Sequence, residues 1–151
     1  MKVLILNGPN LNLLGQREPE IYGETTLNDI AAACSTKGQA LAFNVDFRQS
    51  NSEGELVDWI QAAIDSVEVI IINAAAYTHT SVAIHDALKA FPGFKVELHI
   101  SNPHLRESFR HQSLLTPAVD AVVAGMGSAA YCDVLDVLQP AIDARAIGVD
   151  C

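Results

Sequence analysis

The chain has 151 residues, half of them hydrophobic, and a formal net charge of −9. This length predicts one domain, residues 1–151, with a sizeable core. The negative charge argues against a nucleic-acid or anionic-membrane surface, because such surfaces need clustered positive charge. No apolar run approaches the roughly 18 residues of a membrane span, and the opening VLIL is too short for a signal peptide, so we expect a cytoplasmic protein.

Strand-like and helix-like segments alternate along the chain. Helix start signals occur at Thr26, at Ser52 and at Thr80-Ser81, and a last helix is predicted over 128–146. The first, third and fifth strands lack a polar face, which is typical of a parallel sheet covered on both sides. This order predicts an α/β fold, a flavodoxin-like doubly wound five-stranded parallel sheet with helices on both faces. The predicted strands are 2–7, 40–47, 67–73, 94–100 and 119–125.

Polar side chains gather after the predicted strands. Ligands of open parallel sheets bind beyond the carboxyl ends of the strands, so these side chains should meet at one rim. The rim then collects amides, imidazoles and guanidiniums, a composition suited to a small polar ligand. Its members are Asn7, Asn10, Asn12, Arg48, Gln49, Asn51, Asn73, His79, Glu97, His99, Ser101, Asn102, His104, Arg106 and Arg110.

The connection after the first strand is unusually long. It runs over residues 8–25, whereas comparable loops commonly have about 2 to 6 residues. Long loops in compact domains often act as lids over a site. Arg17 and Tyr22 lie in this connection, so we expect them to be able to close over a ligand.

Glu97 and His99 form a candidate proton-transfer pair. Residues two apart on a strand point to the same side of the sheet. Glu97 can therefore fix the tautomer of His99 and favour its protonated form. A solitary histidine is more often structural, but a carboxylate partner at a strand end favours an acid role.

Four separated motifs resemble those of the type II 3-dehydroquinate dehydratases. They are NGPNLNLLGQREPEIYG, RQSNSEGEL, NAAAYTHTSVAIHDAL and VELHISNPHLRESFRHQS, and together they reach from the first strand towards the last helix. The resemblance implies a metal-free, cofactor-free dehydratase that converts 3-dehydroquinate to 3-dehydroshikimate by anti elimination through an enolate. It also implies a homododecamer of trimeric units.

The resemblance assigns roles to individual residues. Tyr22 is implied as the base, Arg17 as the cation that lowers its pKa from the usual value near 10, and Asn10 as the enolate stabiliser. His99 is implied as the acid and Glu97 as its partner. The implied substrate contacts are Asn73, His79, Ile100, Ser101, Arg110 and, from a neighbouring subunit, Asp86.

Two places depart from the pattern of the family. Many relatives have proline or glycine near Ala74 and Ala75, and arginine where this chain has His85. Neither position carries the chemistry in the family. The departures therefore affect the expected substrate contacts rather than the expected reaction.

Other classes of function remain open from the residues alone. Gly125, Gly127 and Ala130 fit a GxGxxA nucleotide or flavin fingerprint, and Asp150 lies about 20 residues on, but no further strand is predicted to carry that acid. We interpret the glycines as a tight turn. The histidines show no HExxH spacing and the three cysteines no CxxC spacing, so neither a metal site nor a disulfide is indicated. The fold alone would also allow a non-enzymatic interaction module, against which the polar rim argues.

Overall fold

The computed structural model describes residues 1–16 and 24–146 of the chain. Within them lies a five-stranded sheet in the order β2-β1-β3-β4-β5, and every neighbouring pair is parallel. This order is that of the flavodoxin-like doubly wound fold, so the predicted fold class is confirmed. The strands are β1 (Lys2–Asn7), β2 (Asn44–Gln49), β3 (Val69–Asn73), β4 (Phe94–His99) and β5 (Ala121–Ala124).

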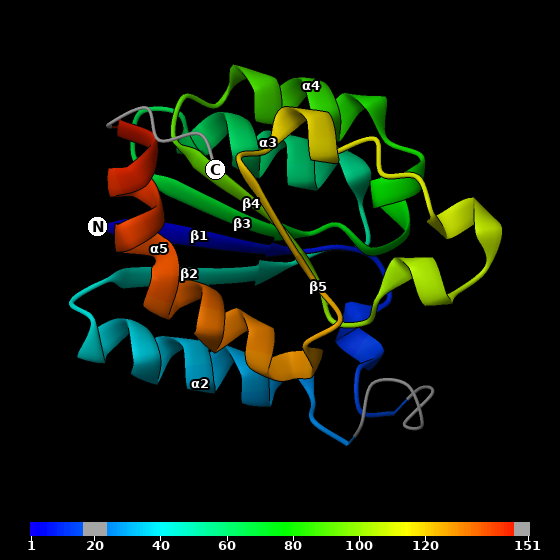
Figure 1. The fold of residues 1–151 in the computed structure, drawn as a ribbon, viewed down its shortest axis with the longest axis horizontal. Coiled ribbons are helices and arrows are strands. Elements are labelled where there is room, and N and C mark those ends of the chain that lie inside the picture. Colours follow the sequence, from blue (N-terminus) through cyan, green and yellow to red (C-terminus); the bar gives the residue numbers. More distant parts are fainter. Residues whose placement is uncertain (17–23, 147–151) are drawn as a thin grey trace.

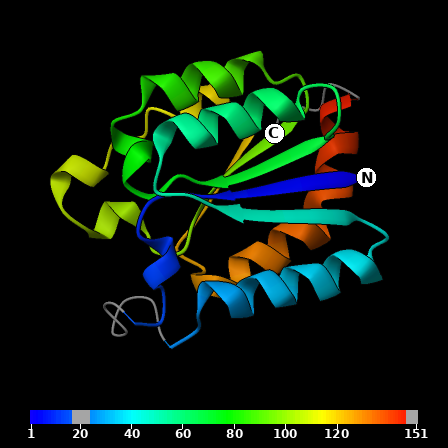
Figure 2. The ribbon, with the colours of Figure 1, turned by 180° about the vertical axis from the view of Figure 1, so that it is seen from behind.

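Four long helices cover the two faces of the sheet among the described residues. Figure 1 shows α3 and α4 on one face and α2 and α5 on the other, and the reverse view in Figure 2 shows the same two layers. The helices are α2 (Leu27–Ala40), α3 (Glu53–Ala63), α4 (Val82–Ala90) and α5 (Ala130–Ala146). Short 3₁₀ helices complete the connections: η1 (Leu11–Leu13), η2 (Ala75–His79), η3 (Pro103–Leu105), η4 (Ser108–Arg110), η5 (Thr116–Ala118) and η6 (Gly127–Ala129).

The central strands divide their side chains between two hydrophobic cores. In β1, Val3 and Ile5 join the core that contains residues of α2 and α5, while Leu4 and Leu6 join the core that contains residues of α3 and α4. Alternation along a strand sends successive side chains to opposite faces. A strand covered on both faces therefore has no polar face, as the sequences of β1 and β3 predict.

The predicted helix start signals form real caps. The Thr26 hydroxyl accepts from the Asp29 amide while the Asp29 carboxylate accepts from the Thr26 amide, which makes a complete capping box. Ser52 and Ser81 cap α3 and α4 through their hydroxyls alone, which accept from the amides of Glu55 and Ile84. The spacing of Ser52 and Glu55 also fits a capping box, but the Glu55 carboxylate accepts from the hydroxyl of Ser50 instead.

The second strand lies later in the chain than predicted. Residues 40–47 were expected to be extended, but α2 continues to Ala40 and β2 begins at Asn44. The helix ends where Ala42 takes a left-handed conformation (φ 56°) and the Phe43 amide donates to the Gly38 carbonyl at 2.8 Å. This is a Schellman-type ending that usually uses glycine, so no obvious stop signal marks the end of this helix in the sequence.

The fifth strand is covered on one face only, which corrects the prediction that it is buried on both. β5 is an edge strand beside β4, and its burial alternates along its length. Val122 is 47% exposed, because no helix of the described residues covers that face at this edge. An apolar strand sequence therefore did not distinguish an edge position from a central one.

Candidate active site

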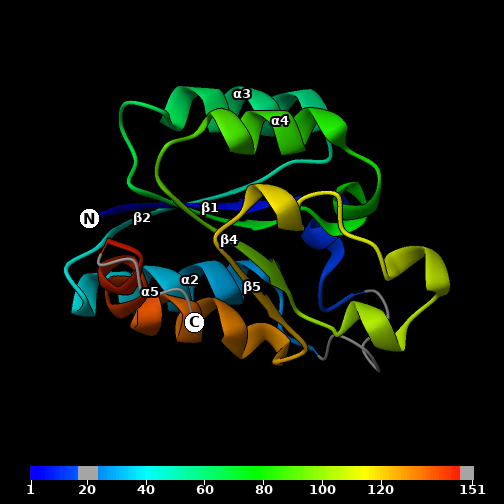
Figure 3. The ribbon, with the colours of Figure 1, turned by 45° about the horizontal axis from the view of Figure 1, so that its top comes forward.

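A cavity of about 170 Å³ lies beyond the carboxyl ends of the central strands. Figure 3 shows the connections after β1 and β4 on this side of the sheet, η1 on one side and the segment through η3 and η4 on the other. The structure thus brings together seven residues predicted for the site. They are Asn10, Asn73, His79, His99, Ile100, Ser101 and Arg110.

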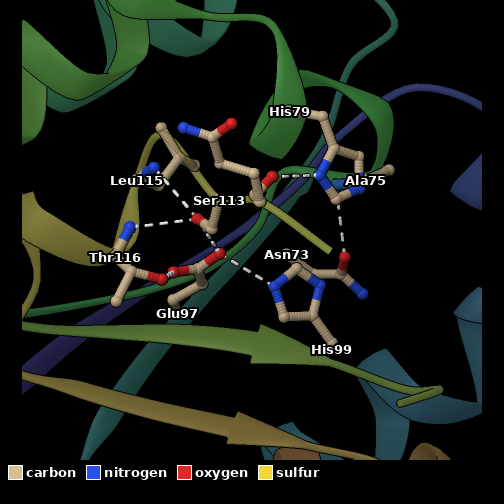
Figure 4. Close-up of polar contacts among 9 residues, drawn as sticks. Asn73, Ala75, His79, Glu97, His99, Ser113, Leu115 and Thr116 are labelled. Atoms are coloured by element: carbon tan, nitrogen blue, oxygen red, sulfur yellow. Dashed lines mark hydrogen bonds and ion pairs between the residues drawn. The ribbon is translucent and has the colours of Figure 1, made fainter. Parts of the chain in front are cut away.

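Glu97 and His99 are hydrogen-bonded at the end of β4, as their spacing predicts. The His99 Nε2 atom lies 2.8 Å from the Glu97 Oε1 atom. Glu97 is fully buried and receives two further bonds, from the hydroxyls of Ser113 and Thr116, each at 2.7 Å. Figure 4 shows the three donors converging on the one carboxylate.

The environment of Glu97 keeps it ionised. Burial by itself raises the pKa of the carboxyl, but the hydrogen bonds from His99, Thr116 and Ser113 outweigh it and hold the pKa below the usual value. An ionised carboxylate only accepts hydrogen bonds, so His99 Nε2 must carry a proton. The Nδ1 atom of His99, which lines the cavity, is then the nitrogen available for proton transfer.

Two histidines fix the backbone on either side of Ser113. The Nδ1 atom of His79 lies 2.7 Å from the Gln112 carbonyl, and the Nδ1 atom of His85 lies 2.6 Å from the Leu114 carbonyl. A carbonyl accepts only, so each Nδ1 carries the hydrogen and each Nε2 is left for other partners. His79 lines the cavity, which makes its Nε2 a candidate substrate contact.

Asn10 begins the short helix η1 in a left-handed conformation, with φ 68°. Its amide donates to the Asn51 Oδ1 atom at 3.0 Å, and Asn51 also accepts from Gln49. These bonds use the Asn10 backbone, while its side chain lies at the cavity wall. Asn51 therefore positions the residue that was predicted to stabilise an enolate.

Asn73 ends β3 and is followed by a strained alanine. The Asn73 Oδ1 atom accepts from the Ala75 amide at 3.3 Å (Figure 4), and Ala75 has φ 52°. Left-handed backbone costs an alanine roughly 1–2 kcal/mol relative to the right-handed region. The chain retains this conformation at Ala75 without glycine, the residue that adopts it most easily.

Arg110 reaches the cavity from η4. Its Nε atom donates to Glu107 at 2.8 Å, and its guanidinium lies 5.0 Å from the centre of the Phe109 ring. The pKa of Glu107 lies below its usual value, chiefly because of a hydrogen bond from the Glu107 backbone amide and then because of the bond from Arg110. Arg106, which the sequence placed on the rim without a role, also lines the cavity.

Some predicted residues are not in this group. Arg17 and Tyr22 lie outside the described residues. Asp86 is exposed on α4 and is not among the described residues that line the cavity. Conversely, sequence reasoning missed the roles of Ser113, the last residue of the motif VELHISNPHLRESFRHQS, and of Thr116, because their contacts with Glu97 depend on the tertiary fold rather than on spacing.

In the glycine turn after β5, the backbone amides are already hydrogen-bonded to the end of β4. The amides of Gly125 and Gly127 donate to the carbonyls of His99 and Ile100, at 3.2 and 3.0 Å. A phosphate-binding turn would need such amides free to meet the phosphate. The turn instead holds the end of β4, so the nucleotide or flavin interpretation loses its structural basis.

Comparison with known proteins decides the family. The family model "Dehydroquinase class II" matches residues 1–139. The chain belongs to the class II dehydroquinases. This dehydroquinase is 53% identical over 137 residues to the 3-dehydroquinate dehydratase of Rhizobium etli (strain CIAT 652), covering 91% of this chain and 94% of the relative. It is 57% identical over 131 residues to the corresponding enzyme of Bartonella henselae, covering 87% and 88%.

Solved structures of the same family share the fold. The type II dehydroquinase from Propionibacterium acnes superposes with a TM-score of 0.89 and 42% identity, covering 92% of this chain and 96% of that chain. The type II dehydroquinase from Butyrivibrio crossotus DSM 2876 superposes with a TM-score of 0.90 and 40% identity, covering 92% of this chain and 97% of that chain.

Within its described residues, the dehydroquinase has no helix long and apolar enough to cross a membrane. Over the same ranges, no three His, Cys, Asp or Glu side chains are grouped to hold a metal ion.

Proposed function

We propose that this dehydroquinase converts 3-dehydroquinate to 3-dehydroshikimate by anti elimination of water through an enolate. The observation that carries the proposal is the buried Glu97 carboxylate bonded to His99 at the wall of the cavity, in a chain of this family. The other polar side chains of the lining carry amides, an imidazole, a hydroxyl and guanidiniums, which suit a ligand with a carboxylate and several hydroxyls.

In the first step, the Tyr22 phenolate takes a proton from the carbon beside the ketone. The electrons move onto the ketone oxygen, and the side chain of Asn10 stabilises the resulting enolate, a task for which one preorganised donor is worth about 3–4 kcal/mol. A phenol is almost wholly protonated at neutral pH, so Arg17 is needed to favour the phenolate. These three roles come from the resemblance and from general acid–base chemistry.

In the second step, the enolate expels the hydroxyl group of the β carbon. The Nδ1–H of a protonated His99 gives its proton to the leaving oxygen, which departs as water, while the carbonyl re-forms beside a new carbon–carbon double bond. Glu97 stabilises the imidazolium before the transfer. Exchange with solvent then removes the proton from Tyr22 and returns one to His99, which resets the enzyme.

The remaining roles concern binding and assembly. Asn73, His79, Arg110 and the backbone at Ile100 and Ser101 bind the substrate. We propose a cytoplasmic homododecamer acting in aromatic amino acid biosynthesis or quinate metabolism. In this assembly Asp86 would approach the cavity of a neighbouring subunit, for which its exposed position leaves it available.

Tyr22→Phe tests the base. The variant keeps the ring and loses the phenolic oxygen, so substrate should bind while proton abstraction stops. Arg17→Ala and Arg17→Lys should raise the apparent pKa of the base in the pH dependence of turnover, with partial activity kept by lysine. A fully active Tyr22→Phe enzyme would refute the assignment, and unchanged pH profiles would limit Arg17 to binding.

His99→Ala tests the acid. Dehydration should fall more than exchange of the proton beside the ketone, because the first step does not use His99. Equal losses of both reactions would mean that His99 is not specifically the acid for the leaving group.

Treatment with EDTA should leave turnover intact, since every proposed step uses a side chain of the protein.

A further inference from the structure

A buried chain of hydrogen bonds runs from the helix α5 to the cavity. The Asn73 Nδ2 atom donates to the Tyr131 hydroxyl at 2.9 Å, and this hydroxyl donates to the Asn7 Oδ1 atom at 2.7 Å. The Asn7 Nδ2 atom donates to the Arg48 carbonyl at 2.9 Å. All three side chains belong to residues that are at most 4% exposed. Nothing in the proposed chemistry so far uses Asn7 or Tyr131.

The backbone fixes the direction of this chain at both ends. The Arg48 carbonyl can only accept, so Asn7 must turn its Nδ2 to Arg48 and its Oδ1 to Tyr131. The hydroxyl of Tyr131 must then donate to Asn7 and accept from Asn73. At the other end the Ala75 amide can only donate, and it meets the Asn73 Oδ1 atom. Both ends therefore demand the same orientation of the Asn73 amide.

Tyr131 is well suited to hold this orientation. It is fully buried, and burial raises the pKa of its phenol, so the hydroxyl remains neutral and keeps its single proton. Its ring packs against Phe47, with 6.0 Å between the ring centres. A ring fixed by packing leaves the hydroxyl little freedom to follow a different arrangement of Asn73.

We propose that Tyr131, supported by Asn7, is a positioning residue that fixes which edge of the Asn73 amide faces the substrate. The amide then offers the cavity one N–H and one lone pair in a fixed order. Without the hydroxyl, only the 3.3 Å bond from the Ala75 amide would oppose a rotation of the Asn73 amide that exchanges donor for acceptor. This inference rests on the proposed function, because Asn73 is taken there as a substrate contact.

The test is a double-mutant cycle with Tyr131→Phe, Asn73→Ala and the double variant. Tyr131→Phe removes one oxygen and keeps the ring, and we expect kcat/KM to fall about tenfold, mainly through KM. In the Asn73→Ala background the same change should alter kcat/KM by less than about twofold, because its target is gone. Equal losses in both backgrounds, or no loss in either, would overturn the proposal.

Val134→Ala is the matched control. Val134 is buried one turn further along α5 and carries no polar group. This variant should lower the melting temperature without changing KM, which separates loss of packing from loss of orientation. If Tyr131→Phe does not fold, Asn7→Ala takes its place in the cycle, because it removes the acceptor that sets the direction of the Tyr131 hydroxyl.

A second readout needs no turnover. In NMR spectra, hydrogen exchange of the Asn73 side-chain amide should be slow in the wild type and in Val134→Ala, and at least about tenfold faster in Tyr131→Phe or Asn7→Ala. Fast exchange in the wild type would overturn the positioning role even if the enzyme is active. Absence of dehydratase activity with slow exchange would instead refute the proposed function and leave the positioning intact.

Discussion

Glu97→Gln should separate the charge of Glu97 from its shape. The Ser113 hydroxyl accepts hydrogen bonds from the amides of Leu115 and Thr116, so it must donate its own hydrogen to Glu97 Oε1. The same oxygen also accepts a hydrogen bond from His99. A glutamine must therefore keep its oxygen there and place its NH₂ group against the Thr116 hydroxyl. Thr116 is exposed, so its hydroxyl can accept this bond and donate to water.

The magnitudes follow from these contacts. A hydrogen bond to a charged group contributes roughly 1.5–3 kcal/mol and a neutral one roughly 0.5–1.5, so three bonds lose about 3 kcal/mol in all. Relief from burying a charge offsets part of this loss, which leaves a net destabilisation of about 1–2 kcal/mol. Glu97→Ala leaves the donors without an acceptor and should cost about 3–5 kcal/mol.

Turnover should respond differently from stability. Loss of the charged partner of His99 should reduce kcat by roughly 10- to 100-fold in Glu97→Gln, since about 1.4 kcal/mol corresponds to a factor of ten. The assays are denaturant unfolding and the ultraviolet absorbance of the conjugated enone product. If Glu97→Gln is as unstable as Glu97→Ala, the inferred hydrogen-bond directions are wrong. If it keeps full activity, Glu97 does not assist the acid.

Three further outcomes follow from the same geometry. Ala75→Gly should stabilise the protein by about 0.5–1 kcal/mol in denaturant unfolding, because Ala75 has positive φ. Ala42→Gly, far from the cavity, should do the same for the same reason. A loss of stability in both variants would contradict the inferred backbone strain. Ser113→Ala should lower the free energy of unfolding by about 2–3 kcal/mol and also lower kcat, since three hydrogen bonds are lost. A wild-type kcat in this variant would mean that Ser113 does not assist the acid. The pKa of Glu97 is lowered by folding, so its contribution is present above the unfolded value, about pH 4.5, and is lost as pH falls through the folded value. Glu97→Gln should therefore have a flatter acid limb in unfolding measured against pH, and an unchanged limb would contradict the shift.

The fold was predictable because its main signals are local. Continuous apolar runs predicted β1 and β3, and Thr26, Ser52 and Ser81 cap the helices that they were expected to start. The errors arose where local signals were missing or ambiguous. Ala42 ends a helix in a conformation that glycine usually supplies, and β5 has the same apolar pattern at an edge as a central strand would have.

The site was predictable where residues share an element and hidden where they do not. Glu97 and His99 are linked by the alternation of one strand, so their contact follows from their spacing. Ser113 and Tyr131 reach the site from distant segments, 16 residues from Glu97 and 58 residues from Asn73. No periodicity relates such positions, and only the packing of the whole domain brings them together.

The two histidine bonds around Ser113 link chemistry to a remote helix. His79 and His85 hold the carbonyls of Gln112 and Leu114, so the residue between them is clamped from both sides. The clamped hydroxyl in turn supports the carboxylate behind His99. His85 lies on α4 and is not among the described residues that line the cavity, so a substitution there would alter the support of Glu97 without touching the substrate. A sequence change on α4 can therefore affect the support of Glu97 and His99 from outside the cavity.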